Sequence, residues 1–173
     1  MHPLVTLANN TIKSIFTKTP VALPEGYDEP RGCFVTITKG GALRGCIGYV
    51  TTNKPLAQAV QELARAAAMD DPRFPPLQEQ ELGSISVEVS VLSKPALIKG
   101  EDAAAKRAAF IPGETGLIVQ RGWASGLLLP QVFDEETRSE EALAMTCEKA
   151  GLPKSAWHDK ETKVYTFTAK AYR

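Results

Sequence analysis

Residues 43–48 read LRGCIG and set a cysteine beside an arginine, between two glycines, in a stretch that otherwise has the composition of a β-strand. Strands pack through their side chains, so two glycines this close indicate that another group approaches the backbone here. Because side chains alternate along a strand, we expect Arg44, Cys46 and Gly48 on one face. A cation beside a thiol favours the thiolate, which is the nucleophilic form. The stretch is therefore the first candidate for a functional site.

This stretch lies on the return strand of a predicted hairpin. Residues 33–38 form the first strand, a Gly-Gly pair supplies the turn, and residues 43–50 form the second strand. Farther along, residues 84–91 alternate strictly, with apolar side chains on one face and three serines and Glu88 on the other. Such a polar face is either solvated or lines a polar cleft, and solvation is the more common outcome in an antiparallel sheet.

The order of the predicted elements indicates the fold class. Helical periodicity predicts helices over residues 4–18 and 55–69. From about Gly100 a second part of the chain begins, with a short helix at 103–109, a hairpin over 116–129, a helix that ends near residue 150 and a strand at 164–169. Strands and helices do not alternate as regular βαβ units, so we predict an α+β fold with a mainly antiparallel sheet and packed helices. The length suits a single domain over residues 1–173, in which part of the chain can form a smaller lobe.

A proline-rich loop follows the second predicted helix. Residues 71–77 read DPRFPPL, and three prolines in this stretch restrict its backbone. Such a loop can hold Asp71 and Arg73 in defined positions. The alternative is a charged connector that is pinned into the core by Phe74, and the sequence leaves both interpretations open.

Composition excludes several classes of partner and site. The 20 basic and 20 acidic residues cancel, which argues against nucleic-acid binding because phosphate contacts need a positive surplus. No apolar stretch approaches the roughly 20 residues of a membrane span, and the N-terminal residues do not resemble a signal peptide. Three cysteines without a close pair fit a reducing compartment, so we expect a cytoplasmic protein without membrane contact.

Metal and cofactor motifs are also missing from the sequence. The chain has no C-x-x-C pair and only two histidines, which makes a structural zinc site improbable. The glycines near residues 40–48 are followed by no Gly-Lys-Ser/Thr and form no G-x-G-x-x-G, so they do not predict a phosphate-binding loop. We therefore expect no bound metal and assign no cofactor.

Several long motifs resemble one known family in order and spacing. They are FVT at 34–36, LRGCIG at 43–48, DPRFPPL at 71–77, ISVEVSVL at 85–92, GLIV at 116–119, GLLLPQ at 126–131 and KAGLP at 149–153. Together they are similar to the AMMECR domain family, whose bacterial and archaeal members are also called protein A of the AmmeMemoRadiSam system. The resemblance covers nearly the whole chain.

The resemblance implies an α+β fold with a larger and a smaller lobe and a cleft between them. The resemblance also implies partner proteins, because genes for a Memo-like protein and a radical SAM enzyme often lie near the genes of this family. The biochemical function of the family is unsettled, and the six-residue motif around the cysteine is its probable functional site. Cys33 stands where the family usually has an aliphatic residue, so we give it no role. His158 lies in a variable stretch, which argues against a Cys-His dyad.

Two interpretations of Cys46 follow from the residues around it. In the first, Cys46 is a nucleophile or a covalent attachment point, Arg44 stabilises the thiolate or binds an anionic substrate group, and Glu88 is the base. Backbone N–H groups around Gly45 and Gly48 would then stabilise a developing oxyanion. In the second, Cys46 is a small buried hydrophobic residue, which is the usual fate of a free cysteine.

Three further polar residues complete the predicted site. Asp71 and Arg73 on the rigid loop and Gln131 after a predicted strand are candidates for substrate binding. The first hypothesis for function is an enzyme or enzyme subunit that uses Cys46 and works with a radical SAM enzyme and a Memo-like protein. The alternative is a non-catalytic binding or scaffold module whose cleft holds a peptide, a small ligand or a partner protein.

Overall fold

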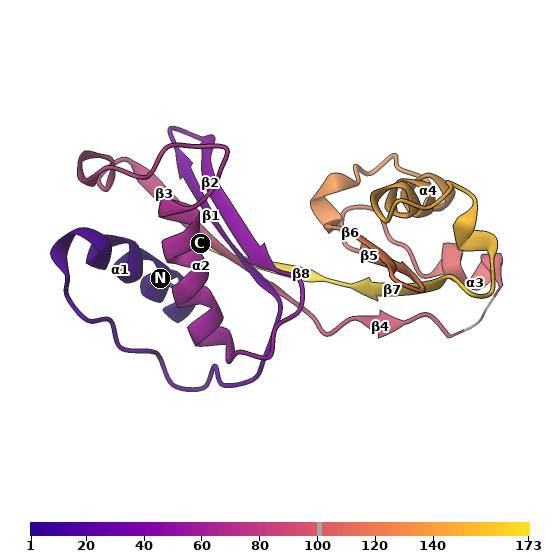
Figure 1. Cartoon of the computed structure of the whole chain (residues 1–173), viewed down its shortest axis with the longest axis horizontal. Coiled ribbons are helices and arrows are strands. Elements are labelled where there is room, and N and C mark those ends of the chain that lie inside the picture. Colours follow the sequence, from indigo (N-terminus) through magenta and orange to yellow (C-terminus); the bar gives the residue numbers. More distant parts are fainter. Residues whose placement is uncertain (100–101) are drawn as a thin grey trace. The chain divides into compact units, whose positions relative to one another are not determined.

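The computed structural model of the chain describes residues 1–99 and 102–173, which divide into two compact units (Figure 1). The first unit comprises Met1–Leu92 and Lys170–Arg173, and the second comprises Ser93–Ala169. The second unit therefore begins before the boundary predicted near Gly100, a residue that itself lies outside the described part. Each unit combines helices with its own four-stranded sheet, so the predicted α+β fold with mainly antiparallel pairing is confirmed.

The sheet of the first unit has the strand order β2-β1-β3-β8. Its strands are β1 (Cys33–Lys39), β2 (Ala42–Tyr49), β3 (Ile85–Leu92) and β8 (Ala169–Tyr172). Strands β1 and β2 form the predicted hairpin, and β3 pairs antiparallel with β1 on its other side. Strand β2, which carries the LRGCIG motif, thus lies at an edge of the sheet.

Two helices, α1 (Pro3–Thr17) and α2 (Leu56–Met69), pack against this sheet (Figure 1). Alternate residues of β1 and β3 enter the core with them, including Val35, Ile37 and Val89, which are fully buried. Each such side chain contributes about 1.5–3 kcal/mol by leaving water. The intervening residues lie on the opposite side of the strands, which we call the outer face; it carries Phe34, Thr36, Cys46, Gly48, Ser86, Glu88 and Ser90.

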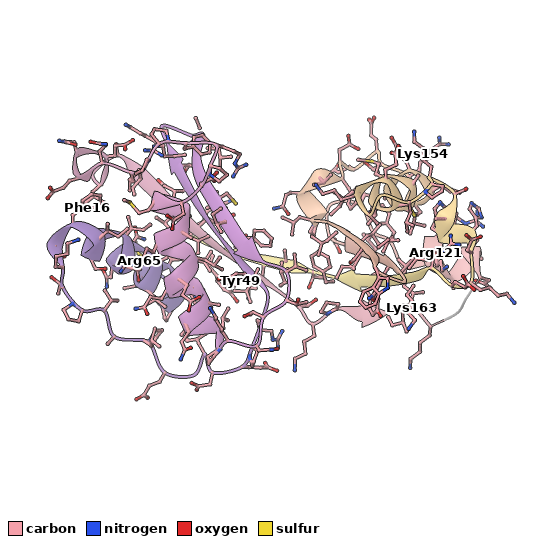
Figure 2. The ribbon with its side chains drawn as sticks, viewed as in Figure 1. Phe16, Tyr49, Arg65, Arg121, Lys154 and Lys163 are labelled. Carbon is pink, nitrogen blue, oxygen red and sulfur yellow. The ribbon has the colours of Figure 1, made fainter. Side chains whose placement is uncertain are left out.

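Both glycines of the motif lie where another group leaves no space for a side chain. A Cβ atom at Gly45 would lie 2.1 Å from the carbonyl oxygen of Ala67 on α2, and one at Gly48 would lie 2.1 Å from the ring of Phe34. The prediction that another group approaches the backbone here is confirmed. Figure 2 shows Tyr49 at the end of β2. The Tyr49 hydroxyl donates to Glu62 of α2 at 3.4 Å, which adds a contact between this strand and the helix.

The second unit has a separate core under a sheet of order β4-β7-β5-β6. Its elements are β4 (Ala96–Leu97), α3 (Ala103–Ala108), β5 (Gly116–Arg121), β6 (Ala124–Leu128), α4 (Ser139–Lys149) and β7 (Lys163–Phe167). The single strand predicted over residues 164–169 is in fact the end of β7 followed by the start of β8, and these two strands belong to different sheets. Among the residues that the structure describes, no helix has both the length and the apolar character needed to cross a bilayer.

The close approach of α2 to β2 makes a stability prediction. Gly45→Ala should lower the free energy of unfolding by at least ~2 kcal/mol, because the new methyl group meets a main-chain carbonyl that cannot rotate away. Gly83→Ala is the matched control, since a Cβ atom there has open space around it. Urea unfolding of both variants measures the difference. Equal stability of the two variants would contradict the packing that we describe.

Candidate functional site

Cys46 lies on the outer face, in a row of polar side chains that crosses three strands. It pairs with Thr36 of β1, and Thr36 pairs in turn with Glu88 of β3. The Cys46 Sγ and the Thr36 Oγ1 are 3.3 Å apart, within hydrogen-bond distance for sulfur. Cys46 is half-buried, whereas Cys33 and Cys147 are buried. Among the three cysteines, Cys46 therefore presents the most accessible thiol.

The main chain of Cys46 is held on its open side by the proline-rich loop. Its N–H donates to Asp71 Oδ2 at 2.8 Å, and its carbonyl oxygen accepts from Arg73 Nη2 at 3.1 Å. An edge strand normally exposes such groups to water or to another strand. Here Asp71 binds the Cys46 N–H and Arg73 binds the Cys46 carbonyl oxygen, so both polar main-chain groups of this residue are held.

Asp71 and Arg73 also form a two-point ion pair with each other. Arg73 Nε donates to Asp71 Oδ1 at 3.0 Å and Nη2 donates to Oδ2 at 2.7 Å, while the Asp71 side chain is almost wholly buried. The hydrogen bond from Arg73, together with that from the Cys46 N–H, holds the pKa of Asp71 well below its usual range although burial opposes this. The Arg73 guanidinium lies 5.5 Å from the centre of the Phe74 ring, a cation–π distance.

Arg73 is also the cation that lies beside Cys46. Its pKa is raised, chiefly by the hydrogen bond to Asp71 and to a smaller extent by the charge of Asp71 and by Cys46. The Arg73 side chain remains 54% exposed, so one side of the guanidinium is open to solvent. The residue pair on the loop therefore supplies both the fixed backbone and a positive charge next to Cys46.

Arg44 serves a different purpose from the one its place in the sequence suggests. The register of β1 and β2 shifts between Ile37 and Thr38, whose partners are Gly45 and Leu43, so Arg44 is an extra residue in a β-bulge. The bulge interrupts the alternation that was expected to place Arg44 on the same face as Cys46. Nη1 donates to the carbonyl oxygen of Pro75 at 2.9 Å. Arg44 thus holds the far end of the proline-rich loop.

The second partner of Arg44 is Glu81, in the short 3₁₀ helix η1 (Glu79–Glu81). Arg44 Nε and Nη2 donate to the two Glu81 carboxylate oxygens at 3.0 and 2.9 Å, and both side chains are largely buried. Lys39 adds a third bond at 3.0 Å. The hydrogen bond from Arg44, with smaller contributions from the Gln78 N–H and from Lys39, lowers the pKa of Glu81 to about 2.

The other two predicted site residues are Glu88 and Gln131. Glu88 is two strands from Cys46, roughly 10 Å away at the usual strand spacing, and it accepts from Arg173 Nε at 2.6 Å. Gln131 belongs to η2 (Pro130–Val132) of the second unit, where it is exposed. The first unit thus brings together Cys46, Asp71 and Arg73.

Two residues of the site were not predicted from the sequence. Thr36, which contacts the thiol, lies inside the FVT motif. A two-residue turn at Gly40-Gly41 would place Thr36 opposite Gly45, and the β-bulge at Arg44 brings Cys46 to that position instead. Glu81, which anchors Arg44, lies outside every motif that we recognised, and no local signal marks it. Across residues 1–99 and 102–173, no group of three or more His, Cys, Asp or Glu side chains is arranged to hold a metal ion.

The Arg44–Glu81 pair predicts a pH dependence. A carboxyl whose pKa falls from 4.5 to about 2 on folding stabilises the protein above pH 4.5, and this contribution disappears as the pH falls from there to about 2. Glu81→Gln should cost on the order of 2 kcal/mol of unfolding free energy at pH 7 and progressively less toward pH 2. Denaturant unfolding across this range measures both values. Glu79→Gln, an exposed carboxyl on the same turn, is the control and should behave as the wild type; a pH-independent cost of Glu81→Gln would refute the assignment.

Known proteins share both the sequence and the fold of this chain. A protein of Methanothermobacter thermautotrophicus is 49% identical over 156 residues, which are 90% of this chain and 81% of the relative. Protein PH0010 of Pyrococcus horikoshii is 44% identical and aligns with 98% of this chain over 87% of its own length. The crystal structure of that uncharacterized protein matches this one with a TM-score of 0.80, and the match covers 97% of this chain and 88% of the chain in the crystal structure. The family model AMMECR1 matches residues 5–172, and the chain therefore belongs to the AMMECR1 family.

Proposed function

We propose that the outer face around Cys46 is the functional site and that Cys46 is the nucleophile of an enzyme or enzyme subunit. The observation that carries this proposal is the clamp on the Cys46 main chain, with Asp71 on its N–H and Arg73 on its carbonyl. These contacts fix the main chain of an edge strand at the one position that carries a half-buried thiol. The clamp fixes the main chain that carries a half-buried thiol, and it places the Arg73 guanidinium against the Cys46 carbonyl oxygen.

The chemistry that suits this arrangement is attack on an electrophilic carbon. The Cys46 thiol loses its proton, the sulfur forms a bond to the carbon, and the bond to the leaving group breaks. The leaving group keeps that electron pair and takes up a proton, so the step needs no oxidant or reductant. Arg73 supplies a positive charge beside the residue that reacts, through its contact with the Cys46 carbonyl oxygen.

Glu88 is proposed as the base, and the Thr36 hydroxyl as the group between it and the sulfur. A direct transfer from Cys46 to Glu88 would have to cross two strand spacings, roughly 10 Å. Thr36 lies between them and its hydroxyl both donates and accepts hydrogen bonds. The proton therefore moves through Thr36 and water rather than in one step.

The remaining predicted residues are assigned as substrate contacts or as supports. Arg73, which is half-exposed, is the proposed contact for an anionic substrate group. Backbone groups at Gly45 and Gly48 remain proposed substrate contacts. Arg44 and Asp71 act as positioning residues, since their side chains are engaged with Glu81 and with Arg73 and Cys46.

One observation favours the alternative of a non-catalytic binding or scaffold module. The side chains of Arg44 and Asp71 both have partners within the first unit, so the LRGCIG and DPRFPPL motifs are partly explained by the way they hold each other. A scaffold requires this mutual support but no reactive thiol. Reactivity of Cys46 in the folded protein separates the two functions.

Alkylation with iodoacetamide provides that test. At neutral pH we expect Cys46 to be labelled in the folded protein, by sulfur attack that releases iodide, while Cys33 and Cys147 are labelled only after unfolding. Burial raises the pKa of Cys33 to about 12 and also raises that of Cys147, so they serve as internal controls. Mass spectrometry of digested samples resolves the three sites.

The contribution of Arg73 is tested in the same assay. Arg73→Gln should slow labelling of Cys46 several-fold, because it removes the positive charge, and Arg73→Lys should retain more of the rate. Unfolding curves for both variants show whether the fold is retained. A Cys46 that is labelled only after unfolding would exclude nucleophilic catalysis, and equal rates in the two variants would exclude the role of the charge.

We also propose that the protein works with a radical SAM enzyme and a Memo-like protein. This proposal is supported by the family resemblance, which implies that genes for these two proteins accompany the genes of the family. Light scattering of the purified proteins, with and without S-adenosylmethionine, should detect a complex larger than each component. Scattering that equals the sum of the separate proteins under both conditions would exclude a stable complex.

A further inference from the structure

A small cavity of about 210 Å³ lies in the second unit, beside the paired strands β4 and β7. Four lysines contribute to its lining, namely Lys99, Lys106, Lys160 and Lys163. None of the described residues that line it is acidic. The cavity therefore concentrates positive charge in a protein whose acidic and basic residues cancel overall.

Two of these lysines face each other across β4 and β7. The Ile98 N–H donates to the Val164 carbonyl oxygen at 3.0 Å, which continues the antiparallel register of these strands. The next pair in this register is Lys99 and Lys163, the first residue of β7, so both side chains leave the same face of the sheet (Figure 2). Like charges directly opposite each other are destabilising. An anion between the two ammonium groups removes this repulsion.

Lys106 fixes the chain segment that brings other lining residues to the cavity. Its buried ammonium group donates to the carbonyl oxygens of Trp157, Asp159 and Thr162 at 2.8, 3.0 and 2.8 Å. Lys160 and Thr162 belong to this segment and line the cavity. The Lys106 ammonium thus holds both residues in place and adds a positive charge to the wall.

The Thr162 hydroxyl is a second feature that indicates a ligand. Thr162 lines the cavity and is 1% exposed, and its Oγ1 has no hydrogen-bond partner within the described part of the chain. Nearly all buried polar groups in folded proteins are hydrogen-bonded, so this hydroxyl indicates a partner that the chain does not supply. A hydroxyl can donate to an anion. The wall that carries the lysines therefore offers a further donor.

We propose that this cavity binds a phosphate group, either of inorganic phosphate or of a small phosphate monoester. The ammonium groups of Lys99, Lys160 and Lys163 donate to the phosphate oxygens, and the Thr162 hydroxyl adds a hydrogen bond. A phosphate carries more negative charge than a single carboxylate and presents more acceptor oxygens, which suits several ammonium groups. Pockets for drug-sized ligands measure about 300–1,000 Å³, so about 210 Å³ suits a ligand little larger than phosphate.

This site does not depend on the chemistry of Cys46. All the residues that line it belong to the second unit, whereas Cys46 belongs to the first. Phosphate binding therefore lies beyond the proposed function, and each can fail without the other. Cys46→Ser should bind phosphate as tightly as the wild type.

Titration of the full 173-residue chain with inorganic phosphate tests binding. Sodium chloride at equal ionic strength is the reference, because it screens charges to the same extent. We expect saturable amide NMR shifts at Lys99, Thr162 and Lys163 and a melting temperature that rises with phosphate concentration. Equal effects of phosphate and chloride would overturn the proposal, as would acetate that binds as tightly as phosphate.

Propyl phosphate distinguishes the two sources of the phosphate group. Tighter binding than that of inorganic phosphate supports a monoester whose carbon chain contacts the apolar part of the lining at Leu97 and Val164. Weaker binding supports inorganic phosphate itself. Absence of binding by both compounds would overturn the site.

A pair of double variants locates the site. Lys160→Gln with Lys163→Gln should weaken phosphate binding at least about tenfold, because charge-assisted hydrogen bonds are lost. The matched control is Lys149→Gln with Lys154→Gln, which removes the same charge from exposed side chains of the second unit outside the cavity. The control should bind like the wild type. Equal loss in both double variants would mean attraction by overall charge and would overturn the site.

Thr162→Val tests the hydroxyl. Valine has nearly the same shape as threonine, and the hydroxyl that it replaces has no partner among the described residues, so the melting temperature without phosphate should not fall. Phosphate affinity should fall several-fold, because the donated hydrogen bond is lost. A lower melting temperature without phosphate, or an unchanged phosphate affinity, would overturn the role of this hydroxyl.

Discussion

The structure around edge strand β2 depends on two contacts to the main chain of Cys46. Asp71 accepts from its N–H, and Arg73 donates to its carbonyl oxygen. Strand β2 is an edge, and its outward N–H and C=O at Cys46 would otherwise need water or another strand. The ion pair is stiffened because one carboxylate serves both Arg73 and the Cys46 amide, and its burial excludes competing water. The prolines of the loop keep these two side chains in register with the strand at little entropic cost. The loop that carries Asp71 and Arg73 therefore both positions Cys46 and covers the edge of the sheet at this residue.

Arg44 anchors the proline-rich loop, and Arg73 supplies the positive charge near Cys46. The sequence alone predicts that charge from Arg44. Arg44, displaced by the β-bulge, secures the loop through Pro75 and Glu81, and its charge is largely neutralised by the Glu81 carboxylate. Arg73 has one partner carboxylate as well but remains half-exposed beside the thiol. A positive charge near Cys46 therefore comes from the loop rather than from the strand. This arrangement links LRGCIG and DPRFPPL physically, since each holds the other in place.

The sheet of the first unit has two edges, which are managed differently. At β2 the loop closes the main chain with side chains, so that edge offers nothing for another strand at Cys46. Strand β8 forms the other edge of the sheet, and a cavity lies along the N-terminal half of β3. Between the edges lies the polar row of Cys46, Thr36 and Glu88.

The sequence by itself determined the elements of the fold and the residues of the motifs. Period-two and period-3.6 patterns placed β1, β2, β3, α1 and α2 correctly, because burial selects side chains locally, and two clustered glycines announced the close approach of α2 and Phe34. It also placed Asp71 and Arg73 on a rigid loop. Tertiary structure alone decided that Arg44 bonds to Glu81, that Thr36 stands between Cys46 and Glu88, and that residues 164–169 divide between two sheets. Bulges, cross-strand neighbours and long-range ion pairs depend on register and on chain segments far apart, which no local pattern encodes.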